Sequence, residues 1–225
     1  FNIFEAYQKN HMKKIVSILS VLAISGLSYL GAQQITLDKI YSGEYRGKGI
    51  AGVASLKSGE QYAVIEAGGI SKYGYKSAKK EGQIAQGRFQ SYNFSQDESK
   101  ILLLTESQSV YRHSFLGKFE IKDMASGKTI PLNMGNFVQE PTFSPDASKV
   151  AFIADNNLFY QDLKSMEIVQ ITNDGKKNSI INGLADWVYE EEFGHARQYE
   201  WTKNSSAIVF VKSDETAVPE MNMQI

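Results

Sequence analysis

The sequence predicts an all-β protein: a partial β-propeller of about three to four blades of four-stranded antiparallel sheet, with one short inserted helix. Two observations lead to this fold. Four similar strand–turn–strand segments recur along the chain, and its 225 residues include 12 Tyr and 12 Phe but only 4 Pro. Aromatic residues favour strands, whereas proline disrupts them.

The four segments share an apolar or aromatic residue, a polar turn and an apolar strand. They read LKSGEQYAVI from Leu56, FSQDESKILLL from Phe94, FSPDASKVAFI from Phe143 and WTKNSSAIVFV from Trp201. Aligned without gaps, they place residues that tolerate tight or left-handed turns at one position, namely Gly59, Asp97, Asp146 and Asn204. The segments begin 38, 49 and 58 residues apart, and a period of about 40–50 with several strands per unit is typical of a propeller.

Further strands fill the intervals between these segments. Residues 157–163 and 167–172 flank a turn at Lys164 and Ser165, and another strand ends before a turn at residues 125–127. Four strands per blade account for this pattern. A ring needs about 4–8 blades to close, so we expect residues 35–225 to be the N-terminal part of a longer, truncated propeller domain.

The longest interval predicts the inserted helix. Asp186 can cap a helix over residues 187–193, and Gly194 can end it. This helix carries three adjacent glutamates among aromatic side chains, Glu190, Glu191 and Glu192. Consecutive helical side chains diverge by about 100°, so two of the carboxylates could hold one cation from two sides.

The N-terminal residues carry a targeting pattern. From Met12, two lysines precede an apolar run that ends in small residues near Ala32, as in a secretory signal peptide. We therefore expect residues 12–32 to be removed, the product to be exported to the periplasm or outside the cell, and no membrane span to remain. We interpret residues 1–11 as non-native translated upstream sequence.

Composition makes several other functions improbable. The net charge of −1 argues against nucleic acid as a partner. The chain has no Cys and three widely spaced His, so we expect neither a metal nor a cofactor. No G-x-S-x-G sequence occurs, so we expect this chain to hold no catalytic residue and to be inactive alone.

Two stretches resemble a known family. NGLADWVYEEEF, followed by Trp201 and ETAVPEMNM, and VYRHSFLGKFEIKDM (residues 110–124) closely resemble the propeller of the dipeptidyl peptidase IV family of serine exopeptidases. The resemblance extends from about Ile35 to the end of the chain. It implies a propeller that covers a C-terminal α/β-hydrolase domain, release of N-terminal dipeptides with Pro or Ala second, and a possible homodimer of the full-length protein.

The resemblance also assigns site residues. It implies that Glu191 and Glu192 bind the free ammonium of a peptide substrate and that Arg112 binds a substrate carbonyl. Two carboxylates suit a cation with three donors, and a planar guanidinium suits a fixed carbonyl oxygen. We expect Glu190 to make structural contacts and Trp187 and Trp201 to be packing residues.

Two other functions remain open. A tripeptidyl peptidase of the same family would share the fold and bind the substrate one residue further from its N-terminus. A non-enzymatic propeller would bind peptides or proteins without cleaving them. The sequence beyond Ile225 would distinguish an enzyme from a binding propeller, because only an enzyme needs a downstream nucleophile motif with later Asp and His.

Overall fold

The computed structural model describes residues 35–47, 49, 52–219 and 221. The chain divides into two compact units, residues 1–49 and 50–225. The described part of the first unit contains the short helix α2 (Leu37–Tyr41), capped by Thr36. The predicted segments 1–11 and 12–32 lie outside the described residues. Within the described part of the chain, no helix has the length and apolarity to cross a membrane.

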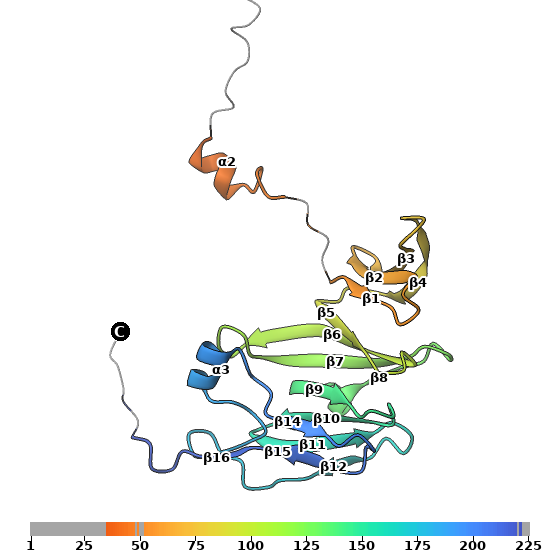
Figure 1. The fold of residues 1–225 in the computed structure, drawn as a ribbon. Helices are drawn as coiled ribbons and strands as arrows, with labels where there is room; N and C mark the ends of the chain where they lie inside the picture. Colours follow the sequence, from red (N-terminus) through yellow and green to blue (C-terminus); the bar gives the residue numbers. More distant parts are fainter. Residues whose placement is uncertain (1–34, 48, 50–51, 220, 222–225) are drawn as a thin grey trace, which may run out of the picture. The chain divides into compact units, whose positions relative to one another are not determined.

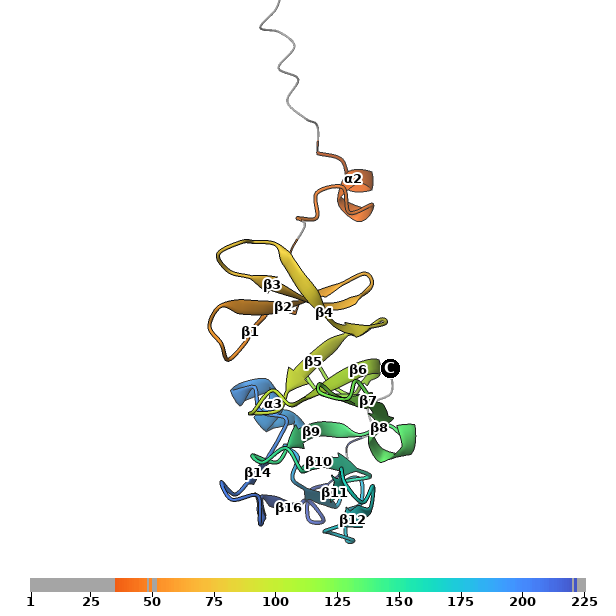
Figure 2. The same ribbon diagram turned by 90° about the vertical axis from the view of Figure 1, so that its right-hand side faces the viewer.

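The second unit consists mainly of antiparallel sheets, three of which have four strands each (Figures 1 and 2). Each of these three sheets is a meander in which consecutive strands pair. The first contains β1 (Ala54–Ser55), β2 (Gln61–Glu66), β3 (Gly69–Gly74) and β4 (Lys80–Gln86). The second contains β5 (Ser91–Phe94), β6 (Lys100–Ser109), β7 (Phe115–Asp123) and β8 (Thr129–Pro131), and the 3-10 turn η1 (Leu132–Gly135) follows it. The third contains β9 (Gln139–Phe143), β10 (Lys149–Ala154), β11 (Asn157–Asp162) and β12 (Ile168–Gln170).

The fourth repeat is built differently. Its strands are β13 (Ile180–Asn182), β14 (Tyr199–Trp201), β15 (Ile208–Phe210) and β16 (Lys212–Asp214). They form two pairs, β13 with β16 and β14 with β15. Between β13 and β14 the chain forms a narrow hairpin, in which Ala185 N donates to Ala196 O at 2.9 Å, with helix α3 (Trp187–Phe193) at its tip. The predicted partial propeller with a short inserted helix is confirmed.

Apolar residues hold successive blades together. Along β6, Ile101 and Leu103 pack with side chains of the first sheet, whereas Leu102 and Leu104 pack with those of the third. The same alternation occurs in β10, where Phe152 faces the second sheet and Ile153 faces the fourth repeat. Both faces of these central strands are therefore buried, which explains their unbroken apolar sequences, ILLL and VAFI.

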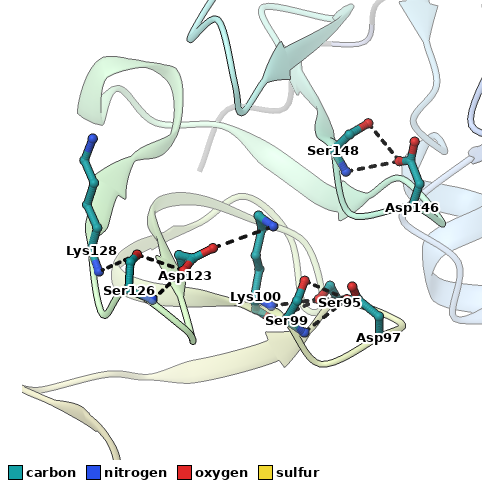
Figure 3. A network of polar contacts seen from close by, with 9 residues as sticks. All are labelled: Ser95, Asp97, Ser99, Lys100, Asp123, Ser126, Lys128, Asp146 and Ser148. Carbon is teal, nitrogen blue, oxygen red and sulfur yellow. Dashed lines mark hydrogen bonds and ion pairs between the residues drawn. The ribbon is translucent and has the colours of Figure 1, made fainter.

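The predicted turns lie between β1 and β2, β5 and β6, β9 and β10, and β14 and β15. The last three of these turns repeat one polar network. In the second blade, Asp97 Oδ1 accepts from the Ser95 hydroxyl at 2.7 Å and from the N–H and hydroxyl of Ser99 (Figure 3). Asp146 in the third blade and Asn204 in the fourth accept from equivalent groups. The side chains thereby satisfy backbone donors that a short turn leaves unpaired.

The gapless alignment of the four turns misplaces one residue, Gly59 in the first blade. The residues with a left-handed backbone are Glu98, Ala147 and Ser205, one position after the Asp or Asn. Gly59 has a φ of +69° and donates its N–H to Leu56 O, as Glu98 does to Ser95 O. Gly59 is therefore equivalent to Glu98 and not to Asp97, because it supplies the left-handed conformation and has no side chain to accept hydrogen bonds.

Candidate functional site

Helix α3 has the two ends predicted from its sequence. Asp186 is the N-cap, and its carboxylate accepts from Tyr189 N at 2.8 Å. Gly194 is the C-cap, with a φ of +67°. Since a helix of seven residues satisfies few of its own backbone groups, these caps matter for its stability.

Arg112 lies on the tight loop that joins β6 to β7. The loop closes where Val110 N donates to Ser114 O at 2.9 Å. Figure 1 shows α3 beside this end of the β6–β7 hairpin. Two segments about eighty residues apart in sequence thus meet, and they carry all three of the predicted site residues.

The first glutamate of the run joins the two segments. Glu190 is only 2% exposed, and its Oε1 accepts from His113 N at 2.8 Å and from Ser114 N at 2.9 Å. Both donors are backbone groups of the Arg112 loop. The contacts of Glu190 are therefore structural, as expected.

The other two glutamates face different surroundings. Glu191 Oε2 lies 3.3 Å from Arg112 Nη1, and the side chains are 17% and 72% exposed, respectively. Glu192 is exposed and forms no hydrogen bond or ion pair with the described residues. The structure thus brings Arg112 and Glu191 into contact and leaves Glu192 open to solvent.

Two carboxyl groups near the junction between α3 and the Arg112 loop have shifted pKa values. Burial opposes ionisation of Glu190, but donors from Ser114 and His113 outweigh it and lower its pKa. The pKa of Glu140, on β9, is raised, mainly by burial; the charge of Glu190 adds to the shift and Arg197 opposes it. Sequence analysis missed Glu140, because an isolated Glu before Pro141 gives no signal of burial.

A partly open hollow of about 660 Å³ adjoins the junction. Ser114, Glu190, Trp187 and Tyr111 are among its lining residues, whereas Arg112, Glu191 and Glu192 are not. Of the two tryptophans expected to pack, Trp201 packs against the core between the third and fourth blades, whereas Trp187 is 53% exposed and is not part of a core. No cluster of three potential metal ligands occurs among the described residues.

Comparisons of the sequence identify similar proteins. The model of the family "Dipeptidyl peptidase IV (DPP IV) N-terminal region" matches residues 95–225. A probable dipeptidyl-aminopeptidase B of Aspergillus niger is 33% identical over 230 residues, covering 90% of this chain and 25% of that protein. Its counterpart from Penicillium rubens is 40% identical over 134 residues, covering 58% of this chain and 15% of that protein.

A solved structure is also similar. The crystal structure of Porphyromonas gingivalis dipeptidyl peptidase 4 superposes with a TM-score of 0.77 and 35% identity, over 84% of this chain and 29% of that one. The four-stranded antiparallel sheets and this structural similarity define part of a β-propeller. The chain belongs to the dipeptidyl peptidase IV N-terminal region family. It spans about a quarter or less of the length of these curated relatives.

Proposed function

We propose that this chain is the substrate-recognising part of an exported serine dipeptidyl peptidase. In this proposal, Glu191 and Glu192 bind the free ammonium of a peptide, and Arg112 binds a carbonyl oxygen of the same peptide. The observation that carries the proposal is the contact between Arg112 and Glu191 beside an exposed Glu192.

The charges of Arg112, Glu191 and Glu192 suit a peptide N-terminus. Arg112 engages one oxygen of Glu191, so the second oxygen remains available to a ligand. One guanidinium and two carboxylates carry a net charge of −1, which attracts a cation. An ammonium brings three donors to these carboxylates, whereas an acylated nitrogen brings neither the charge nor the donors.

Cleavage requires groups supplied elsewhere. The proposal assigns the nucleophile, its Asp and His partners and the oxyanion hole to a C-terminal α/β-hydrolase domain, which the resemblance implies. Holding the N-terminus at a fixed distance from that nucleophile would select the second peptide bond, with Pro or Ala preferred at the second position.

The proposed export would follow from residues 12–32. N-terminal sequencing of the mature protein tests this prediction. We expect a start near Gln33, and retention of residues 15–30 would contradict removal of the signal peptide.

Replacing each carboxylate tests the proposal in the full-length protein. Glu191→Gln and Glu192→Gln should each lower kcat/KM for free-amine peptides about ten- to a hundredfold, because each removes a charge-assisted contact. Glu200→Gln is a control, because Glu200 lies on β14 and pairs with Arg197 instead of Arg112. Steady-state kinetics measures the change, and melting temperature checks that each variant folds.

The released fragments separate this proposal from its alternatives. Mass spectrometry of the products should show dipeptides. Tripeptides would identify a tripeptidyl peptidase, and peptide binding without hydrolysis would identify a binding propeller. Full activity in both glutamine variants would show that the acidic run does not bind the ammonium.

A further inference from the structure

Glu190 has a position unlike that of its two neighbours. Its carboxylate is buried, and one oxygen accepts two consecutive backbone N–H groups of the loop, from His113 and Ser114. Arg112, immediately before these residues, is 72% exposed, and its one ion pair with a described residue is to Glu191. Exposed ion pairs restrain a side chain weakly. The position of Arg112 therefore depends mainly on the backbone of its loop.

The fold offers this loop few other attachments. It is the tip of the β6–β7 hairpin, and the contact between Val110 N and Ser114 O closes it on itself. The Ser114 hydroxyl is buried and makes no hydrogen bond within the described part of the chain. Glu190 is thus the side chain that ties the loop to α3, which also carries Glu191 and Glu192.

We propose that Glu190 is a positioning residue, which fixes the backbone beneath Arg112 and so sets the distance between Arg112 and the two ammonium-binding glutamates. The inference rests on the function proposed above for Arg112. A buried acceptor is needed for this role, and a net charge is not. Glutamine can therefore replace Glu190, because its carbonyl oxygen still accepts both N–H groups.

The test compares Glu190→Leu and Glu190→Gln in the full-length protein. Leucine has a similar size but no acceptor. It should lower kcat/KM about ten- to a hundredfold, as expected when a substrate-positioning group shifts. Glutamine should lower it no more than about threefold, because it keeps the hydrogen bonds. Glu190→Ala repeats the test if leucine does not fit the site.

A double-mutant cycle with Arg112→Ala separates positioning from simple destabilisation. If Glu190 acts through Arg112, Glu190→Leu should cost less than about twofold once Arg112 is absent. Tyr199→Phe is the matched control, because it removes a buried hydroxyl that bonds to the backbone carbonyls of Glu140 and Ala151 in the third blade and to no residue of the Arg112 loop. Its cost should be the same in both backgrounds. An equal cost of Glu190→Leu in both backgrounds would overturn the proposal.

Hydrogen exchange gives a readout that does not depend on activity. The amides of His113 and Ser114 should exchange at least about tenfold faster in Glu190→Leu and near the wild-type rate in Glu190→Gln. Unchanged exchange in the leucine variant would overturn the anchoring role. If Arg112→Ala leaves activity intact, the function proposed for Arg112 fails, and exchange alone decides: faster exchange supports the loop anchor, and unchanged exchange refutes it.

Discussion

At the scale of single residues, three adjacent glutamates have three different environments. Glu190 is buried against a loop backbone, Glu191 contacts Arg112 and Glu192 is exposed. The helix causes this separation, because consecutive side chains point about 100° apart. A run that reads as one acidic patch in the sequence is therefore three separate groups in the folded chain.

Arg112 provides a test of geometry rather than charge. Arg112→Ala should lower kcat/KM about tenfold or more through lost carbonyl positioning. Arg112→Lys should recover only part of this, because an ammonium lacks the planar pair of donors. The side chain is exposed, so the melting temperature should hardly change in either variant. Recovery of full activity by lysine would show that charge alone is sufficient.

Part of this site could be predicted from the sequence. The rare stretch DWVYEEE and the residues around Arg112 indicated the candidate residues through the family resemblance. The sequence did not indicate that Glu190 would bond to the backbone of the Arg112 loop, or that Glu140 would lie near it with a raised pKa. Both features depend on contacts between segments far apart in the chain, which local patterns do not encode.

At the scale of elements, the short helix depends on its cap. Asp186→Ala removes the acceptor for Tyr189 N and should destabilise the protein by about 1 kcal/mol. The activity should fall as well, because α3 carries all three glutamates. Asp186→Ser keeps a capping oxygen and should behave nearly as wild type. Denaturant titration measures the loss, and equal stability of the alanine and serine variants would contradict the role of the cap.

The blade turns should make stability depend on acidity. The Ser95 hydroxyl, with help from Ser99, lowers the pKa of Asp97 from 3.8 to about 2. A carboxylate with a lowered folded-state pKa contributes stability above its unfolded pKa, and this contribution disappears as the pH falls toward about 2. Asp97→Asn should weaken this dependence, because an amide oxygen still accepts hydrogen bonds and does not titrate between pH 4 and 2.

The fourth blade supports that substitution, since Asn204 occupies the equivalent position and accepts the same kinds of hydrogen bond. Melting temperatures at pH 5 and pH 2.5 provide the measurement. The variant should lose less stability than the wild type between these values. An identical loss would exclude Asp97 as a contributor.

The turns also show where sequence comparison reaches its limit. The shared order of an apolar or aromatic residue, a polar turn and an apolar strand located the turns of all four segments. The first blade has LKSG instead, and an ungapped alignment misplaced Gly59 by one residue. In each turn, one residue accepts the side-chain hydrogen bonds and the next residue has the left-handed backbone. An alignment of residue types does not show which of these two roles a glycine takes.

At the scale of the whole molecule, the repeats were sufficient to predict blades of four strands. Apolar runs on both faces of β6 and β10 require a neighbouring sheet on each side, and this alone indicates stacked blades. The split fourth repeat could not be predicted in this way, because the hairpin that carries α3 separates β13 from β14, and β13 then pairs with β16.

The most direct test of the central claim compares two substrates in the full-length protein: one peptide with a free N-terminus, and the same peptide acetylated. The account predicts that the wild type cleaves the free peptide at least about a hundredfold more efficiently, since acetylation removes contacts to both Glu191 and Glu192. In Glu192→Gln this preference should shrink. Equal cleavage of both peptides by the wild type would contradict the account.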